Sequence, residues 1–497
     1  LDDHGNQSEL PVDWNPSDYL RRLPGTIDVR VRGATVKVAG WQYDMIGMTG
    51  YCVPVILLDT NMEENNPDDR GLTRYLYGGD EAYRFAQEMI LGMGGVRMLE
   101  KLGYSNLTKF HMNEGHASLL AMELLRDRRR QEAPEWDFEG ARKTCIFTTH
   151  TPVAAGHDHF SYKLVEEYLG GEFPLEIIKM LGGNDRLNMT LLALNMSHYI
   201  NGVAKRHGEV SKEMFPAYPI DTITNGVHSY TWTSDSFKCL FDKYIPGWTT
   251  DSFTLRYSLG ISKEEIWDAH VEAKKLLCDH VNKEMNIGMD FEAFTIGFAR
   301  RATLYKRLDL IFSDVDRLRS VASRAGRIQL IFAGKAHPKD WPGKELIKKI
   351  FRASHELKDH IKIAYLVDYD MELAKILTSG VDLWLNTPQK PLEASGTSGM
   401  KAAHNGVPSL SVLDGWWLEG HVEGVTGWSI GSRSMESDGH RPEAQEIYDK
   451  LESIILPMYY GNRDKWTEIM RHCIAFNASF FNTQRMVQQY VLNAYLH

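Results

Sequence analysis

The chain contains 497 residues, of which 43% are hydrophobic and 25% are charged. This is the composition of a globular protein, and it excludes a disordered chain, a coiled coil and a disulfide-rich miniprotein. The 56 Lys and Arg residues are outnumbered by 66 Asp and Glu residues, which gives a formal net charge of −10. That balance argues against a nucleic-acid binder, although a local basic pocket for an anion remains compatible with it.

No stretch of the sequence approaches the ~20 apolar residues of a membrane span, so no membrane partner is expected. The N-terminal segment lacks the basic start and apolar core of a signal peptide. Because the first residue is Leu1 rather than Met, we expect a processed or incomplete chain. The five cysteines are scattered without a CxxC pair, which predicts a reducing, cytoplasmic location and no cysteine-bound zinc.

Apolar strands alternate with amphipathic helices along the first half of the chain. Strands are predicted at 53–60, 107–116, 143–151 and 220–228, and helices at 80–103, 117–130 and 189–215. The long helix at 80–103 contains a glycine interruption. A polar segment follows the strand at 220–228, and the first domain is therefore predicted to end at residue 230.

The alternation is more regular from about residue 290 onward. Strands are predicted at 294–299, 327–334, 361–368, 381–387 and 407–415, and helices at 310–322, 344–357, 371–380 and from about 398. Continuous apolar strands separated by helices are typical of parallel sheets covered on both faces. The sequence therefore predicts an α/β protein of two doubly wound domains, residues 1–230 and 231–497, whose last helix could pack back on the first domain. Ligands of such domains bind at the carboxyl ends of the strands.

A basic cluster follows the predicted strand at 294–299. It consists of Arg300, Arg301, Lys306 and Arg307. Guanidinium and ammonium groups at a strand end suit a phosphate, which arginine can bind through two parallel hydrogen bonds. A solvated basic helix start is the structural alternative, and position alone leaves the two interpretations balanced.

A lysine among small residues follows the predicted strand at 381–387. Gly396, Ser398 and Gly399 would let a ligand approach the backbone, and Lys401 lies about one turn into the following helix. An amine beside a phosphate cradle is what a pyridoxal phosphate site requires. By spacing alone, a capped helix with a surface lysine is the favoured interpretation.

Histidines follow two strands of the first half, His116 in NEGH and His150 in TTHTP. Neither segment has the HExxH spacing of a zinc site, and a lone histidine at a strand end is more often a hydrogen-bonding group. The pair Asn225-Gly226 reads as a turn. We therefore predict no metal site.

Taken together, seven segments resemble the α-glucan phosphorylase family, and most closely its shorter bacterial and archaeal branch. In chain order they are NEGH (113–116), TTHTP (148–152), NGVAKRHGEVSKEMF (201–215), TNGVH (224–228), GFARRATLYKR (297–307), IFAGKAHP (331–338) and EASGTSGMKAAHNG (393–406). One such motif would be weak, whereas seven in the order of the family are highly specific.

The resemblance implies a GT-B fold, which has two Rossmann-like domains with the active site in the cleft between them. It implies a glycosyltransferase that uses pyridoxal 5′-phosphate (PLP) and inorganic phosphate to release α-glucose 1-phosphate from an α-1,4-glucan or maltodextrin, with retention of configuration. In this family the inorganic phosphate is the acid and the cofactor phosphate relays the proton, so no carboxylate pair is needed. A homodimer is also implied.

The resemblance also assigns residues. Those implied for the cofactor are Lys401 (Schiff base), Arg300, Thr397 and Ser398 (5′-phosphate) and Tyr369. Those implied for the substrate phosphate are Arg301 and Lys306, with Tyr305 lining the pocket. Those implied for the sugar are His150, Asn225, Glu393, Ala394, Ser395 and Gly396, with Asn113, Glu114 and His116 bordering the site. Lys401, Arg301, Lys306 and His150 are the expected catalytic residues.

Two alternatives remain beside a phosphorylase. The GGLGxLAG segment that the family carries near its N-terminus is not found, and the start of this chain resembles the family segment that follows it, so the first strands of domain one are expected to be missing. The chain could thus be a glucan-binding homologue without activity. A nucleotide-sugar glycosyltransferase would share the fold and the basic strand end, but would leave Lys401 unexplained.

Overall fold

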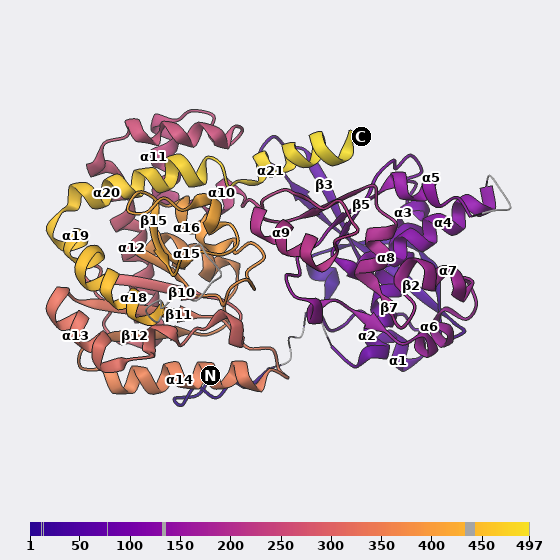
Figure 1. Ribbon diagram of the computed structural model, residues 1–497, viewed down its shortest axis with the longest axis horizontal. Coiled ribbons are helices and arrows are strands. Elements are labelled where there is room, and N and C mark those ends of the chain that lie inside the picture. The colour runs from indigo at the N-terminus through magenta and orange to yellow at the C-terminus, as the bar shows by residue number, and fades with distance from the viewer. Residues whose placement is uncertain (11, 13, 77, 132–135, 433–442, 497) are drawn as a thin grey trace. The chain divides into compact units, whose positions relative to one another are not determined.

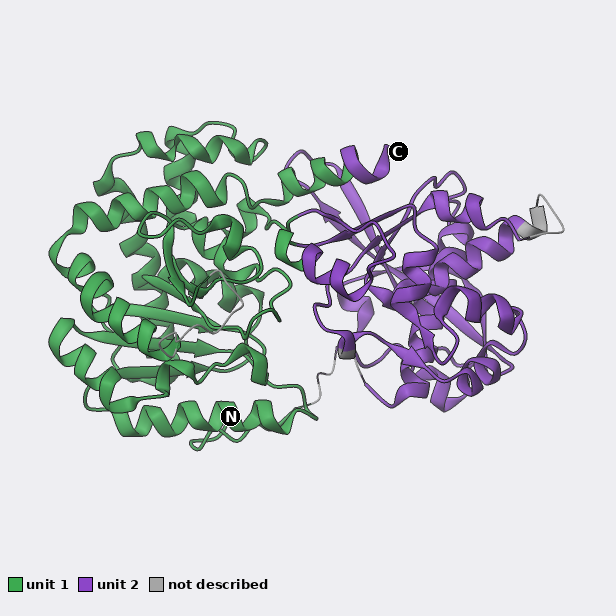
Figure 2. Cartoon of the chain, viewed as in Figure 1, with its two compact units in different colours: residues 1–11, 204–207, 224–491 green, residues 12–203, 208–223, 492–497 purple. Residues whose placement is uncertain are grey.

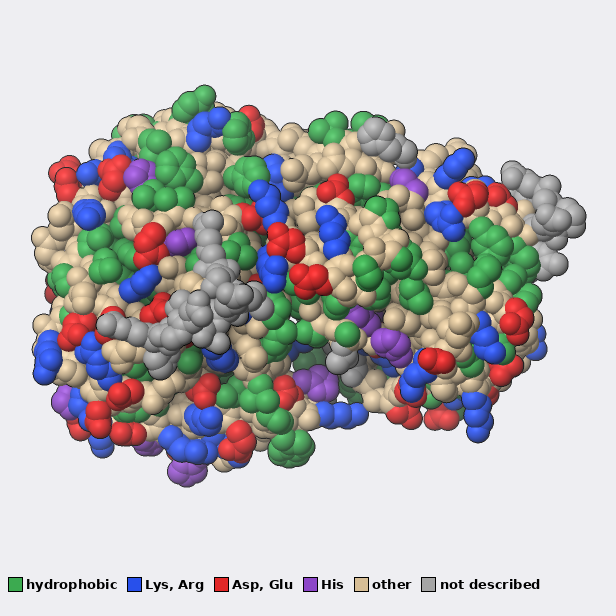
Figure 3. Space-filling model, in the orientation of Figure 1, with side chains coloured by type: hydrophobic (Ala, Val, Ile, Leu, Met, Phe, Trp, Pro, Cys, Tyr) green, Lys and Arg blue, Asp and Glu red, His purple; other side chains and the backbone are tan. Residues whose placement is uncertain are grey.

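The computed structural model describes the chain except residues 11, 13, 77, 132–135, 433–442 and 497 (Figure 1). The chain divides into two compact units (Figure 2). Unit 1 comprises residues 1–11, 204–207 and 224–491, and unit 2 comprises residues 12–203, 208–223 and 492–497. On the face shown in Figure 3, charged side chains of both signs are interspersed.

Unit 1 is built on a six-stranded parallel sheet with the order β12-β11-β10-β13-β14-β15. Its strands are β10 (Phe294–Ala299), β11 (Ile328–Ala333), β12 (Lys362–Leu366), β13 (Leu383–Asn386), β14 (Ser409–Val412) and β15 (Gly427–Ile430). β10 and β11 are buried at every position, because helices cover both faces of the sheet. The direction of the strand order reverses between β10 and β13, so this doubly wound sheet has its switch point there.

The helices of unit 1 account for most of the amphipathic segments of the second half. They are α10 (Ser229–Trp232), α11 (Asp235–Tyr244), α12 (Lys263–Met285), α13 (Val315–Ala325), α14 (Trp341–Leu357), α15 (Met371–Gly380), α16 (Ser398–Ala403), α17 (Trp417–Gly420), α18 (Glu443–Lys450), α19 (Leu456–Gly461), α20 (Arg463–His472) and α21 (Thr483–Tyr490). Most begin at a polar residue whose side chain accepts a hydrogen bond from a backbone N–H of the first turn, as Asp370 does for α15.

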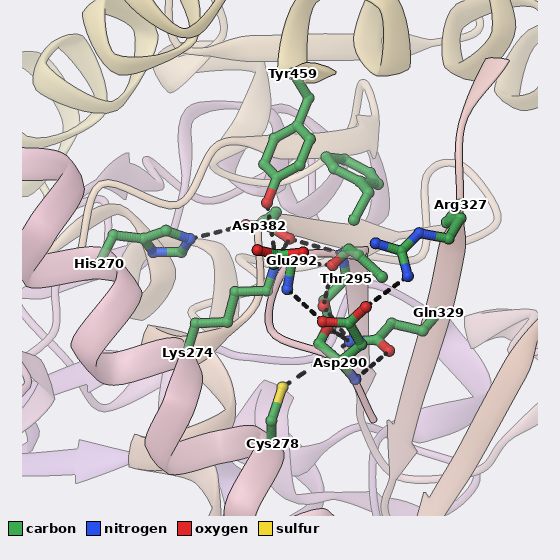
Figure 4. A network of polar contacts seen from close by, with 12 residues as sticks. His270, Lys274, Cys278, Asp290, Glu292, Thr295, Arg327, Gln329, Asp382 and Tyr459 are labelled. Atoms are coloured by element: carbon green, nitrogen blue, oxygen red, sulfur yellow. Dashed lines mark hydrogen bonds and ion pairs between the residues drawn. The ribbon is translucent and has the colours of Figure 1, made fainter. Parts of the chain in front are cut away.

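A buried charged network ties the amino ends of β10 and β13 to the helices (Figure 4). Asp382 accepts hydrogen bonds from Thr295 N (2.7 Å) and from His270 Nε2 (2.8 Å), and it contacts Lys274 Nζ. Lys274 also donates to Ala293 O (2.8 Å) and to the Tyr459 hydroxyl (2.9 Å). Burial raises the pKa of Asp382, but Lys274 and His270 outweigh it and hold that pKa below its usual value.

Unit 2 contains a parallel sheet with the order β4-β5-β8-β9 and a separate antiparallel sheet with the order β1-β2-β3. The parallel strands are β4 (Phe110–Asn113), β5 (Cys145–Thr148), β8 (Tyr199–Gly202) and β9 (Asp221–Thr222), and the antiparallel ones are β1 (Arg21–Val31), β2 (Ala34–Ile46) and β3 (Cys52–Asp59). β6 (His159–Phe160) and β7 (Leu187–Asn188) form a two-stranded pair. Val29, Val36 and Val38 are buried on one face of the antiparallel sheet, against the core that includes Phe85 and Met89.

The helices of unit 2 are between 4 and 13 residues long. They are α1 (Pro67–Arg70), α2 (Glu81–Met89), α3 (Gly95–Lys101), α4 (Leu119–Gln131), α5 (Phe138–Thr144), α6 (Tyr162–Leu169), α7 (Leu175–Gly182) and α8 (Met189–Asn195), with α9 (Lys205–Met214) divided between the units. A π-helical turn, Ile90–Gly94, joins α2 to α3 at the predicted glycine interruption.

Three sequence-based predictions need correction. The long helix predicted at 189–215 is wrong, because Tyr199–Gly202 forms β8 and pairs in parallel with β5. The strand predicted at 53–60 does exist as β3, but it lies in the antiparallel sheet rather than in a Rossmann-like one. β1, β2 and β15 were not predicted at all. β8 is specified by a partner about 50 residues away in the sequence, whereas β1, β2 and β3 pair with their neighbours along the chain.

The division of the chain also differs in detail from the predicted boundary at residue 230. The first residues group with unit 1, where Gln7 hydrogen-bonds with Ala336 and Glu9 pairs with Lys344 Nζ (2.7 Å) at α14. Residues 492–497 group with unit 2. There the Tyr495 hydroxyl lies 2.8 Å from His111 Nδ1.

Candidate active site

The candidate site lies at the carboxyl ends of the central strands of unit 1. The loop after β10 carries Arg300, Arg301 and a 3-10 turn at Leu304–Lys306, and the loop after β13 leads to α16. Arg307 joins the two loops by donating to Thr387 O (2.9 Å) and Pro388 O (2.7 Å). These loops flank the switch point of the sheet, where doubly wound proteins bind their ligands.

Two predicted anion-binding residues meet a predicted sugar-binding residue in one buried cluster. Glu393 accepts from Lys306 Nζ at 3.0 and 2.9 Å and pairs with Arg300 Nη2 at 2.6 Å. Arg300 also contacts Asn386 Oδ1 at the end of β13. Burial alone would raise the pKa of Glu393, but the two cations outweigh burial and hold that pKa below its usual value. For Lys306, burial and the charge of Arg300 lower the pKa to about 8.

Asp414, which sequence reasoning did not identify, supports this cluster from the end of β14. Its carboxylate accepts from Glu393 N and Gly415 N, both at 2.9 Å. Burial raises its pKa to about 6, despite these backbone hydrogen bonds. Its position as an acidic residue at the carboxyl end of the predicted strand at 407–415 is the signal that could have found it.

Lys401 lies in the second turn of α16, partly buried, with Nζ 3.7 Å from the centroid of the Trp232 ring. Burial lowers the pKa of its amine to about 8. A surface lysine would keep a pKa near its usual value of about 10.4. Lys401 is half-buried and α16 has no side-chain cap at Thr397, so the structural interpretation, a surface lysine on a capped helix, does not describe this residue.

The segment from Glu393 to Ser398 contains hydroxyl groups that can still form hydrogen bonds with a ligand. Ser395 Oγ is buried and has no hydrogen-bond partner among the described residues. Ser398 Oγ accepts from Trp384 Nε1 at 3.0 Å, so its own proton is available to another acceptor. Thr397 caps no backbone N–H of α16. At Gly396 φ is +81°, and a Cβ there would lie 3.2 Å from the Glu393 side chain, so a larger residue would strain the backbone and crowd Glu393.

The predicted tyrosines surround the cations. Lys306 Nζ lies 4.5 Å from the centroid of the Tyr305 ring. Burial raises the pKa of Tyr305, and the positive charges of Arg300 and Arg301 partly offset this increase. Burial also raises the pKa of Tyr369 to about 12, again opposed by Arg300. Both phenols therefore stay protonated and can donate hydrogen bonds at neutral pH.

Asn225 also belongs to unit 1, in the irregular segment before α10, where the turn predicted at Asn225-Gly226 is not formed. The Asn225 carbonyl accepts a hydrogen bond from Arg485 Nη2 at 3.0 Å, which fixes the backbone of this segment. None of the described contacts joins Asn225 to Glu393 or Lys401. Its predicted role in sugar binding is therefore not tested by this geometry.

The remaining predicted residues belong to unit 2, at the carboxyl ends of β4 and β5. Glu114 accepts from His150 N (2.7 Å) and the Thr151 hydroxyl (2.9 Å), while the His150 ring donates to Asn113 Oδ1. Glu114 has φ 69° and ψ 171°, a region that is essentially restricted to glycine. The structure thus brings Asn113, Glu114 and His150 together at strained backbone.

His116 lies in a second polar cluster of unit 2. Its ring pairs with Asp158 Oδ2 at 3.0 Å, and Arg84 Nη2 binds the same carboxylate at 2.9 Å. Glu88 completes a set of three potential metal ligands with His116 and Asp158. The guanidinium of Arg84 already supplies a cation to this set. Pairing of the His116 ring with the carboxylates of Asp158 and Glu88 raises the pKa of His116 to about 9.

Fold and site together define a class: an α/β protein whose parallel sheets carry cationic, carboxylate and amine groups at the carboxyl ends of their strands. A family model described as carbohydrate phosphorylase matches residues 157–423, which include the whole Arg300–Lys401 region. The chain belongs to the carbohydrate phosphorylase family, and its fold is of the GT-B class.

Relatives extend this similarity along nearly the whole chain. Maltodextrin phosphorylase of Thermococcus litoralis is 38% identical over 99% of this chain and 63% of its own length. Glycogen phosphorylases of Aquifex aeolicus and Mycobacterium tuberculosis are 36% and 35% identical, over 94% and 89% of this chain and 73% and 58% of their own lengths. The chain thus spans about three-fifths to three-quarters of these relatives. None of the helices in the described part of the chain has the length and apolar character to cross a membrane.

Proposed function

We propose that this chain carries the α-glucan phosphorylase activity: PLP-dependent, phosphate-driven release of α-glucose 1-phosphate from the end of an α-1,4-glucan, with retention. The observation that supports this most is the Arg300–Lys306–Glu393 cluster at the switch point, together with the low-pKa amine of Lys401. The names of the relatives, maltodextrin and glycogen phosphorylase, point to the same substrate class.

The residues of unit 1 fit PLP. An amine with a pKa of about 8 is neutral often enough near pH 7.5 to react with an aldehyde. Ser398 has a free hydroxyl proton, and Arg300 a guanidinium, for the 5′-phosphate. Tyr369 is a protonated phenol in the same region. When bound, PLP would supply a phosphate that exchanges a proton with the substrate phosphate.

The cations would serve the substrate phosphate. Lys306 is nearly buried and pairs with Glu393, which it shares with Arg300. An incoming phosphate carries the same kind of charge as Glu393, so it can replace that carboxylate at Lys306 without leaving an ammonium unpaired. Glu393 then becomes available to accept from sugar hydroxyls. Arg301, whose charge acts on Tyr305, would provide the guanidinium for the substrate phosphate, while Arg300 would bind the 5′-phosphate of PLP.

The sugar would occupy the side of the site formed by residues 393–396. The buried Ser395 hydroxyl lacks a partner among the described residues, and burying such a group costs free energy unless a ligand satisfies it. Gly396 lets the backbone pass close to the Glu393 side chain, which would face the same sugar. The contributions of Asn225, His150 and His116 to sugar binding stay predictions.

The test incubates the full chain with PLP, inorganic phosphate and a maltodextrin. We expect glucose 1-phosphate to be released, with no release when phosphate is omitted or when Lys401 is replaced in Lys401→Ala. Lys465→Ala, an exposed lysine of α20, is the matched control and should retain activity. Binding of maltodextrin without release would favour the glucan-binding alternative, and activity with a nucleotide sugar would favour the glycosyltransferase.

Two further properties belong to this proposal. The five cysteines are all free thiols, which supports a reducing, cytoplasmic location. A homodimer is proposed from the family, and sedimentation of the full chain at several concentrations would measure it.

A further inference from the structure

Two buried side chains at the end of α16 connect the helix of Lys401 to the segment around α10. His404 and Asn405 are both fully buried. Asn405 Oδ1 accepts from Ser234 N at 2.7 Å, and its Nδ2 donates to Trp232 O at 2.8 Å and to Lys401 O at 3.2 Å. One amide therefore bridges the carbonyl of Lys401 and the carbonyl of Trp232.

His404 fastens the other end of α10. One ring nitrogen, Nδ1, faces Met400 O at 2.8 Å and must therefore donate. The other, Nε2, lies 2.9 Å from Ser229 Oγ and accepts its proton. Burial lowers the pKa of His404 to about 4, so the ring stays neutral and keeps this arrangement at physiological pH.

The contacts of Asn405 and His404 with the α10 segment affect the surroundings of the Lys401 amine. Trp232 ends α10, and its ring lies against Lys401 Nζ. The ring restricts the flexible lysine chain and covers the amine from water, although its π face also attracts the ammonium form. Since burial is what lowers the pKa of Lys401, the position of Trp232 helps to decide how much free amine is present.

We propose that Asn405 is a positioning residue: by holding Trp232 and Lys401 together through their carbonyls, it presents the Lys401 amine for covalent binding of PLP. This inference deepens the proposed function and rests on it for the identity of the aldehyde. The arrangement of the amine itself does not depend on the later reaction with glucan.

The test measures labelling of Lys401 by PLP in the full chain. Nζ joins the aldehyde carbon with loss of one water, and borohydride then adds hydride to the C=N bond, so mass spectrometry can quantify the stable label. In Asn405→Ala we expect the PLP affinity to fall about tenfold or more, and Trp232→Ala should lose as much; the double variant should lose no more than either, because the two residues act in one chain of contacts. Trp232→Phe keeps a ring and should restore most of the affinity.

Asn282→Ala is the matched control. Asn282, in the same unit, also makes two side-chain bonds to backbone, both with Met289, but it does not touch Lys401. It should bind PLP like the unmodified chain. Wild-type affinity in a folded Asn405→Ala protein, or strictly additive losses in the double variant, would overturn the proposal.

A second readout needs no cofactor. Acetic anhydride labels neutral amines, so the pH dependence of Lys401 acetylation reports its pKa. In Asn405→Ala, water reaching the amine should move the midpoint upward from about 8 toward the ordinary lysine value; an unchanged midpoint would contradict the proposal. If wild-type Lys401 is labelled but no glucose 1-phosphate is formed, the proposed function fails while the positioning role stands.

Discussion

At the scale of single residues, Glu393 is the counter-ion that allows two cations to be buried. The substitution Glu393→Gln removes this charge and leaves Arg300 and Lys306 without a counter-ion. The unfolding free energy should fall by about 3–5 kcal/mol. Inorganic phosphate should restore part of this loss, because the anion can take the place of the carboxylate. Thermal unfolding with and without phosphate measures both effects.

The comparison with wild type decides this prediction. Phosphate should raise the melting temperature of Glu393→Gln more than that of the unmodified chain. Glu345→Gln, which removes an exposed carboxylate of α14, should behave like wild type. Equal stabilisation of all three proteins by phosphate would show that the anion does not bind at the cluster.

Glu114 combines strained backbone with three hydrogen bonds to its carboxylate, from Gly115 N, His150 N and the Thr151 hydroxyl. Replacement by Ala loses the acceptors and keeps the strain, whereas replacement by Gly loses the acceptors and relieves it. We therefore expect Glu114→Gly to be more stable than Glu114→Ala by about 1 kcal/mol, the reverse of the usual order of these residues. Urea unfolding of the two variants gives the difference, and a more stable alanine variant would contradict the strain argument.

His116 gives unit 2 a pH-dependent contribution to stability. Its pKa is raised to about 9 by Asp158 and Glu88, so the stabilisation is complete below the unfolded value of about 6.5 and is lost as pH rises through 9. The raised pKa of Glu88, about 8 because of burial, acts in the same direction. The urea midpoint should fall between pH 6.5 and 9.5, and less so in His116→Gln; an equal fall in both would exclude His116 as a source.

At the scale of elements, the Asp382 network fixes the amino ends of β10 and β13, whereas the candidate site uses their carboxyl ends. Asp382→Asn should lower the unfolding free energy by about 3–5 kcal/mol, since Lys274 would be left buried without its counter-charge. PLP affinity should be unchanged wherever the variant is folded. Asp279→Asn, an exposed position of α12, serves as the control. A parallel loss of PLP affinity would mean that the two ends of these strands are coupled.

The elements also show where sequence reasoning succeeds. β10 was predicted at 294–299 and α15 at 371–380, and both predictions are confirmed to the residue. Each has a buried face and a clear boundary within its own sequence. The helix predicted at 189–215 failed because Tyr199–Gly202 carries no strand signal stronger than the helical pattern around it. Its pairing with β5 outweighs local preference.

At the scale of the whole molecule, the residues proposed for PLP and phosphate all belong to unit 1. Addition of PLP should therefore slow backbone hydrogen exchange in residues 300–307, 393–405 and 229–234, because ligand binding stabilises the loops it orders. Exchange in β1 and β2 of unit 2 should not change. Mass spectrometry of peptic peptides measures this, and protection absent from residues 393–405 would contradict the assignment of Lys401.

The sequence by itself determined the family, the α/β class and the identity of the anion-binding and amine-bearing segments. Those features are local: strand ends, small residues and basic side chains occur within short stretches that can be read one at a time. Arg300, Lys306 and Lys401 could therefore be selected without any structure.

Only the tertiary structure decided what these residues do to one another. The pairing of Glu393 with two cations, the support from Asp414, and the docking of Trp232 onto Lys401 through Asn405 join positions that are 21 to 173 residues apart. Burial then sets the pKa of Lys401, and burial is a property of the folded surroundings rather than of the residue. The sequence thus supplied the chemical groups, and packing supplied their charge states and partners.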